Sequence, residues 1–125
     1  MIKLIYIATG GAIGAVLRYA TSGLFYALMG TNFPYGTLSV NVIGSLLIGF
    51  FFELLEQTTI SSDMRLLIFV GIFGAFTTFS SFSLETVNLF RDGEIMLATA
   101  NILLNNVLAI GGTILGILAY KYFFI

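Results

Sequence analysis

The chain contains no cysteine and no histidine among its 125 residues. Without cysteine there is no disulfide framework, no thiol chemistry and no cysteine zinc site. The lack of histidine removes the usual general base and the commonest transition-metal ligand. Charge is also scarce, at 9% of residues with a net charge of −1, so neither nucleic acid nor an acidic partner is indicated. With carboxylates expected only near the ends of apolar segments, no catalytic constellation is visible and we expect no enzyme.

Apolar residues are correspondingly abundant and make up 58% of the chain. The average soluble domain carries roughly 25% charged residues, so a soluble helical core is a poor alternative. Three charge-free runs, Tyr19–Phe52, Leu66–Leu84 and Ile95–Tyr120, each approach or exceed the roughly 20 residues that cross a bilayer. The composition therefore predicts an all-α integral membrane protein.

We expect one transmembrane domain over residues 1–125, with spans at about 3–29, 36–56, 64–90 and 95–120. The apolar start could be mistaken for a signal peptide, but it lacks the usual small-x-small cleavage site, so we expect a retained first span. Ser62 or Asp63 is the expected N-cap of the third span. Pairs of small residues four apart, such as Gly10/Gly14 and Gly112/Gly116, favour close helix packing.

Polar side chains mark the first two spans. Arg18 lies near the far end of the first span, where it either reaches the headgroups or faces a water-filled vestibule that attracts anions. Thr37, Asn41 and Ser45 recur every fourth residue and share one face of the second span. Such a stripe faces protein or water rather than lipid, and Asn41 acts either as interhelical glue or as a hydrogen-bond donor to a ligand.

The stretch 71–83 is the most unusual part of the chain. It places five hydroxyl residues in the middle of an apolar span, together with Phe79 and Phe82 three residues apart. About 27 residues separate Met64 from Phe90, more than one crossing needs, so we expect a break near Gly74–Thr78. Unwound backbone at membrane depth exposes carbonyl oxygens that need a ligand such as a cation.

Three stretches, residues 11–19, 36–45 and 71–82, resemble the Fluc (CrcB) family of small fluoride channels. The combination of Thr-Thr-Phe-Ser-Ser-Phe with Val-Asn-x-x-Gly-Ser is the specific signal. The resemblance implies an antiparallel, dual-topology homodimer in the bacterial inner membrane, with two anion pores that passively export fluoride. Its implied partners are fluoride, membrane lipid and a second copy of the chain.

The resemblance also implies roles for individual residues. A central structural sodium ion would be held by the backbone carbonyls of Gly74 and Thr77. Phe79 and Phe82 would face the anion with their electropositive ring edges, Asn41 would lie beside them, and Arg18 would lie in the vestibule. The chain departs from the family at Ser81, where threonine is usual, and at Asn101 and Asn105, where tyrosine and serine are common.

The residue types present suit a small, strongly hydrated anion, because a pore must replace its water with dense donors. We expect these donors to come from the side chains of Asn41, Thr78, Ser80, Ser83 and Asn105. Two alternatives remain open: a small multidrug-type transporter, which needs an acidic residue in its first span, and a membrane subunit that only packs. The first span has no such residue.

Overall fold

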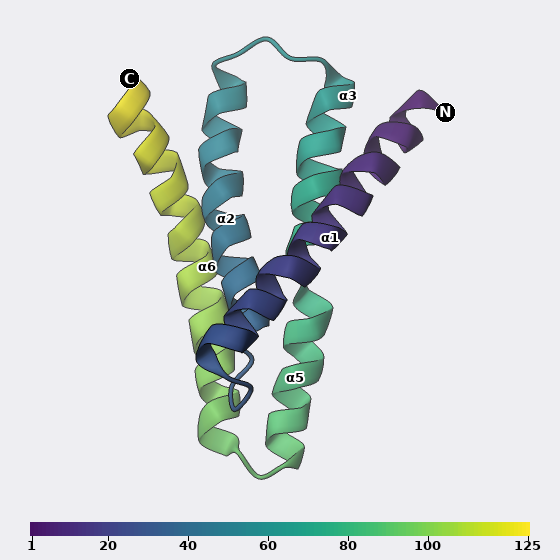
Figure 1. Cartoon of the computed structure of the whole chain (residues 1–125). Helices are drawn as coiled ribbons and strands as arrows, with labels where there is room; N and C mark the ends of the chain where they lie inside the picture. Colours follow the sequence, from purple (N-terminus) through teal and green to yellow (C-terminus); the bar gives the residue numbers. More distant parts are fainter.

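The structure, a computed structural model that describes residues 1–125, consists only of helices and their connections (Figure 1). Four helices are long and apolar enough to cross a membrane, which confirms the predicted all-helical membrane architecture. The third is bent and divided into shorter pieces. In chain order the elements are α1 (Ile2–Met29), α2 (Tyr35–Glu56), α3 (Ser62–Arg65), η1 (Leu66–Phe73), α4 (Gly74–Phe76), α5 (Phe79–Arg91) and α6 (Ile95–Phe124).

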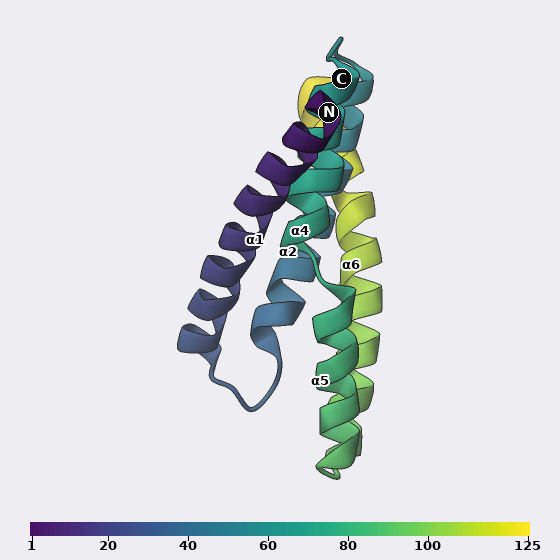
Figure 2. The same cartoon turned by 90° about the vertical axis from the view of Figure 1, so that its right-hand side faces the viewer.

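Helices α2 and α6 lie side by side, while α1 crosses the third span obliquely (Figures 1 and 2). Both chain termini and the α2–α3 connection lie at one end of the bundle (Figure 1). Glycines permit the close approaches. A Cβ atom added at Gly116 would overlap the carbonyl oxygen of Leu46 on α2, and one added at Gly71 on η1 would lie 2.7 Å from the Cα of Gly10 on α1. These contacts are the backbone-to-backbone packing that small residues allow in membranes.

The third span begins differently from the sequence-based prediction. Its N-cap is Ser61, whose side chain accepts a hydrogen bond from the backbone N–H of Met64 at 3.2 Å, so the prediction of Ser62 or Asp63 is wrong. From Leu66 to Phe73 the chain then forms a π-helix, which is wider than an α-helix. This wide segment packs along α1 and leads directly into the break.

The predicted break is present, but glycine does not make it. Gly74 has helical angles (φ −61°, ψ −36°), whereas Thr77 (φ −85°, ψ 157°) and Thr78 (φ −149°, ψ 113°) are extended. The β-branched residues therefore carry the unwound backbone, in keeping with their preference for extended conformations. In Figure 2 the chain between α4 and α5 is an unwound connection that offsets the two halves of the span.

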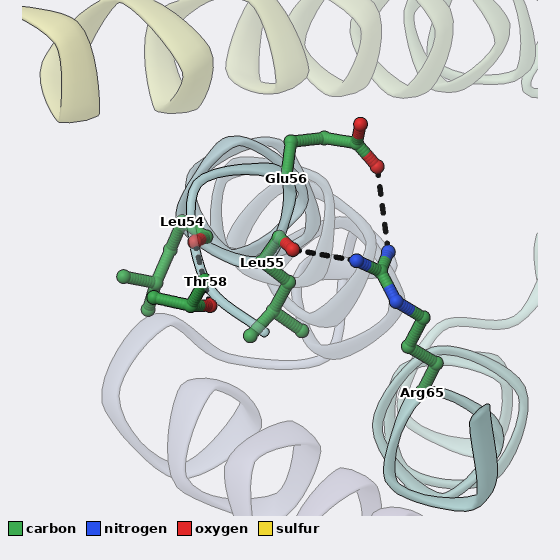
Figure 3. Close-up of polar contacts among 5 residues, drawn as sticks. All are labelled: Leu54, Leu55, Glu56, Thr58 and Arg65. Atoms are coloured by element: carbon green, nitrogen blue, oxygen red, sulfur yellow. Dashed lines mark hydrogen bonds and ion pairs between the residues drawn. The ribbon is translucent and has the colours of Figure 1, made fainter. Parts of the chain in front are cut away.

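One end of the bundle is fixed by polar contacts around Arg65 (Figure 3). Its Nη2 donates to the backbone oxygen of Leu55 at 2.6 Å, and its Nη1 lies 3.3 Å from Oε1 of Glu56. Nearby, Lys121 on α6 lies 3.8 Å from Glu53 on α2. Because the Arg65–Glu56 ion pair is well exposed, we expect it to contribute less than about 1 kcal/mol to stability.

Most of the apolar side chains point outward. Only 23 of the 125 residues are buried within the single chain, and the exposed residues include many leucines, isoleucines and valines of α1 and α6. An outward apolar surface of this kind is what a helix bundle presents to lipid or to another membrane subunit.

Candidate functional site

Thr78, the second of the two extended residues of the third span, is held by Asn41 of α2. Its Oδ1 accepts the backbone N–H of Thr78 at 2.8 Å, and its Nδ2 donates to the backbone oxygen of Thr78 at 3.1 Å. One amide side chain thus satisfies both backbone groups of a residue outside any helix, which is what an apolar environment requires. The second N–H of the Asn41 amide donates to Oδ1 of Asn105 on α6 at 2.9 Å. Asn41 therefore connects the break to both neighbouring spans.

Thr78 also starts the second half of the span. It is the N-cap of α5, and its Oγ1 accepts the backbone N–H of Ser81 at 3.1 Å. The same hydroxyl donates to Oγ of Ser81 at 3.0 Å, and Oγ of Ser80 lies 3.3 Å away. Three hydroxyl groups therefore gather at the N-terminus of α5, where the helix dipole favours negative charge.

A cavity of about 280 Å³ lies beside the break, between α2, α5 and α6. Its polar lining includes the side chains of Asn41, Thr78 and Asn105. Phe79 and Phe82 form part of its wall, with ring centroids 5.2 Å apart and ring planes inclined by 61°. Phe82 is buried, whereas Phe79 is 76% exposed in the single chain. The cavity thus combines amide donors with aromatic rings and contains no carboxylate.

A second cavity, of about 370 Å³, opens between α1, α2 and α5. It is lined by polar groups of all three helices, including Arg18, Thr37, Ser81 and Glu85. Thr78 lines both cavities, so the break is the wall that they share. A cationic side chain and hydroxyl groups make this second cavity wettable, in contrast to the lipid-facing surface around it.

Glu85 corrects the expectation that carboxylates occur only near span ends. It lies in the middle of α5, half-buried, and its Oε1 accepts the hydroxyl of Thr37 at 2.7 Å. Its other carboxylate oxygen is buried and has no hydrogen-bond partner within the chain. Arg18 lines the same cavity but lies beyond ion-pair distance of Glu85. The cavity is therefore lined by both a guanidinium group and a carboxyl group, separated by space that water or an ion can fill.

Two backbone oxygens at the break have lost their usual helical partners. The N–H of Thr78, which in a continuous helix would reach the Gly74 oxygen, donates to Asn41 instead. The Thr77 oxygen accepts no hydrogen bond, since the N–H of Ser81 donates to the Thr78 hydroxyl. Neutral carbonyl oxygens of this kind suit a hard monovalent cation, and no acidic cluster offers an alternative metal site.

The structure brings together only part of the predicted pathway. Asn41, Thr78, Phe79, Phe82 and Asn105 line the first cavity and Arg18 the second. Ser80 contacts the Thr78 hydroxyl but lines neither cavity, and Ser83 is exposed and lines neither.

Two polar residues of this region, Glu85 and Thr86, have no role in the prediction from the sequence. The sequence does mark Thr37, in the polar stripe of α2, and Asn101, which lies four residues from Asn105 on the same helix face. What the sequence did not reveal was that Asn101 would donate to Thr86 on the neighbouring helix, at 2.9 Å.

Comparison with known proteins decides the family. Residues 5–117 match the family described as CrcB-like protein, Camphor Resistance (CrcB). The chain belongs to the CrcB family. Among its relatives, a protein of Shewanella amazonensis is 51% identical over 93% of this chain and 94% of its own length. A protein of Geobacter sulfurreducens is 48% identical over 97% of this chain and 98% of its own length. A protein of Parabacteroides distasonis is 46% identical over 97% of this chain and 94% of its own length.

Each of these three CrcB relatives bears the name fluoride-specific ion channel FluC. All three are bacterial proteins, and the match extends over nearly the full chain on both sides. The resemblance to the Fluc (CrcB) family stated from the sequence motifs is thereby confirmed. The CrcB family is one of ion channels, and the expectation that the chain is not an enzyme is confirmed with it.

Proposed function

We propose that this chain forms a fluoride-specific channel that passively exports fluoride from the bacterial cytoplasm across the inner membrane and so reduces its toxicity. The observation that carries the proposal is the cavity at the helix break, where amide groups and the rings of Phe79 and Phe82 surround a space without carboxylates. A cation pathway would favour acidic groups or ring faces, whereas an anion favours N–H donors and ring edges.

The two cavities form the two halves of the proposed pathway. An anion would first meet the positive charge of Arg18 in the larger cavity, which raises its local concentration. It would then pass the hydroxyl groups around Thr78, which lines both cavities, and reach Asn41, Asn105 and the phenylalanine rings. Both N–H groups of Asn41 donate within the chain, so an anion that binds this amide must replace the Thr78 oxygen or Asn105 Oδ1 as acceptor.

A single chain would supply only part of the pore wall. Phe79 lines the cavity but is 76% exposed, so its outer side needs a further wall that excludes lipid from the path. We propose that a second copy, inserted in the opposite orientation, supplies this wall and that the homodimer contains two anion pores. The weak charge bias between the ends supports dual topology, with Lys3, Arg65 and Lys121 at one end and Arg91 at the other.

A structural sodium ion would fit the carbonyl oxygens of Gly74 and Thr77 in this dimer. The unpartnered oxygen of Thr77 is the observation that supports the fit. Two oxygens are too few to replace a hydration shell, so the same pair from the second copy would complete the site. When bound, the ion would neutralise the facing carbonyl dipoles and hold the two breaks together.

The test is anion efflux from liposomes that contain the purified protein. Rapid loss of fluoride, with chloride retained, is the expected result, and protein-free liposomes provide the baseline. Protein that releases no fluoride would rule the proposal out. The variant Ser83→Ala is informative in the same assay, because Ser83 lines neither cavity and unchanged flux would remove its hydroxyl from the pathway.

A further inference from the structure

The amide groups at the cavity belong to a chain of hydrogen bonds that extends well beyond it. Thr78 N–H donates to Asn41, Asn41 donates to Asn105 at 2.9 Å, and Asn105 donates to Asn101 at 2.9 Å. Asn101 then donates to the Thr86 hydroxyl at 2.9 Å, and Thr86 donates to the Phe82 carbonyl at 2.7 Å. The chain thus starts at the N-cap of α5, passes through α2 and α6, and returns to α5.

The two ends of this chain determine its direction. A backbone N–H only donates and a backbone carbonyl only accepts, so Thr78 and Phe82 fix the sense of every bond between them. If any one of the three amides turned over, it would place N–H against N–H or oxygen against oxygen. Hydrogen bonds arranged head to tail also strengthen one another in a medium of low dielectric constant. Each asparagine is therefore held in one orientation by its neighbours.

Two members of the chain are remote from the cavities. Asn101 is fully buried and Thr86 is 7% exposed, and neither lines the cavity at the break or the Arg18 cavity. Both N–H groups of Asn105 are directed at Asn101, toward its backbone oxygen at 3.0 Å and its side-chain oxygen. The Asn101 side chain supplies one of the two acceptors for the Asn105 N–H groups, and Thr86 accepts the Asn101 amide in turn, so both residues favour the orientation in which Asn105 offers its oxygen to Asn41.

We propose that Asn101 and Thr86 are positioning residues for the anion pathway: they set the orientation of the Asn105 amide, whose oxygen accepts the N–H of Asn41 beside the cavity. This inference rests on the proposed channel function. Its consequence is that a hydroxyl one helical turn beyond Phe82 controls conduction without contacting the ion. An Asn105 amide that turned over would place its N–H groups against the N–H of Asn41, which would lose its acceptor and shift from its place at the pathway.

Thr86→Val tests the proposal, because valine keeps the shape of threonine but cannot hydrogen-bond. Single-channel fluoride currents in planar bilayers are the measurement, since the current of each open channel does not depend on how much protein folds. A hydrogen bond of about 1 kcal/mol changes the ratio of the two Asn105 orientations about fivefold, so we expect the unitary current of Thr86→Val to fall by up to that factor. Thr86→Ser should restore it. Thr99→Val is the matched control, because the Thr99 hydroxyl donates only to Ile95 of its own helix.

A unitary current in Thr86→Val equal to that of the wild type, or one in Thr86→Ser as low as in Thr86→Val, would overturn the proposal. If Thr86→Val fails to fold, the double variant Asn101→Leu with Thr86→Val replaces both buried partners by apolar groups, which is far less disruptive than leaving one unpaired. The double variant should carry the same reduced unitary current as Thr86→Val. A wild-type unitary current in the double variant would also overturn the proposal.

The proposed function and this inference fail in different ways. A wild-type protein that carries no fluoride current rules out the channel, and the role in the pathway with it. If the wild-type channel conducts and Thr86→Val has the same unitary current, the proposed channel function stands and only the positioning role is ruled out.

Side-chain amide NMR signals of Asn41 give a readout independent of conduction. They should shift in Thr86→Val and stay in place in Thr99→Val.

Discussion

Substitution of Gly14 by alanine tests the closest contact between α1 and the segment that leads to the break. An added Cβ at Gly14 would overlap the carbonyl oxygen of Ile72 and lie 3.0 Å from the Cβ of Ala75. Ordinary carbon–carbon contacts lie at about 3.5–4.0 Å, so α1 must move away by roughly 0.5–1 Å. The obstacle is backbone rather than a flexible side chain, and overpacking of this kind costs about 1–3 kcal/mol.

Gly11→Ala is the matched control, because a Cβ at Gly11 meets no atom within 4 Å. Both variants gain the same helix propensity, about 1 kcal/mol, so the difference between them isolates the contact. For a chain of this length, the expected difference in Tm is roughly 4–12 °C, with Gly14→Ala the less stable. Thermal unfolding of the purified protein in detergent measures it. Gly23→Ala is a second control, because a Cβ at Gly23 also meets no atom within 4 Å. Similar Tm values for Gly11→Ala and Gly23→Ala would show that the Tm of the first control does not depend on a role peculiar to Gly11.

Equal Tm values for Gly14→Ala and Gly11→Ala would refute the packing of α1 against η1 and α4 described above. The reasoning would also fail if Gly14→Ala were as stable as Gly23→Ala, because then no tight backbone contact exists at Gly14. A lower Tm in all three variants would instead indicate that the whole face of α1 is covered by something other than η1 and α4.

Three further predictions concern conduction and the cation. Arg18→Gln should lower fluoride efflux at low ionic strength and lower it much less at high salt, because salt screens the attraction of an anion to the cavity. Lys3→Gln, at the exposed N-terminus, is the control and should leave efflux unchanged at both salt concentrations. Phe79→Ile and Phe82→Ile should each reduce efflux strongly by removing a ring edge, and full flux in both would make these rings packing residues. Replacement of sodium by a large organic cation should lower the Tm of the dimer, whereas an unchanged Tm would argue against a structural sodium ion.

Hydropathy along the chain predicted the four membrane-length helices, because each apolar run is long enough to cross a bilayer. A surplus of residues between Met64 and Phe90, with hydroxyl groups in the middle, was enough to locate the break within a few residues. Of the two residue types expected to favour the break, the β-branched threonines are the extended ones, whereas glycine permits unwinding but does not require it. Gly74 stays helical, and Asn41 stabilises the extended Thr78 from another span.

The π-helix over Leu66–Phe73 had no sequence signal. Its residue types are ordinary in apolar α-helices, and the segment packs along α1. Glu85 was passed over for a different reason. It lies inside the expected span at 64–90 but close to the end of that span, and only the fold shows its carboxyl group half-buried in a cavity and bonded to Thr37. The sign and spacing of charges were visible in the sequence, but not which cavity they faced.

The double role of Asn41 explains why one polar residue in α2 supports both the fold and the site. A break in a membrane helix releases a backbone N–H and a backbone C=O, and each costs several kcal/mol if it stays unpaired in an apolar medium. An asparagine amide carries one acceptor and two donors, so it can satisfy both groups and still have one N–H left. At Asn41 that N–H points to Asn105 and thereby starts the chain that ends at Phe82. The polar cavity of the proposed pathway is therefore linked to the break, since Asn41, the amide that stabilises the unwound backbone, also lines the space beside it.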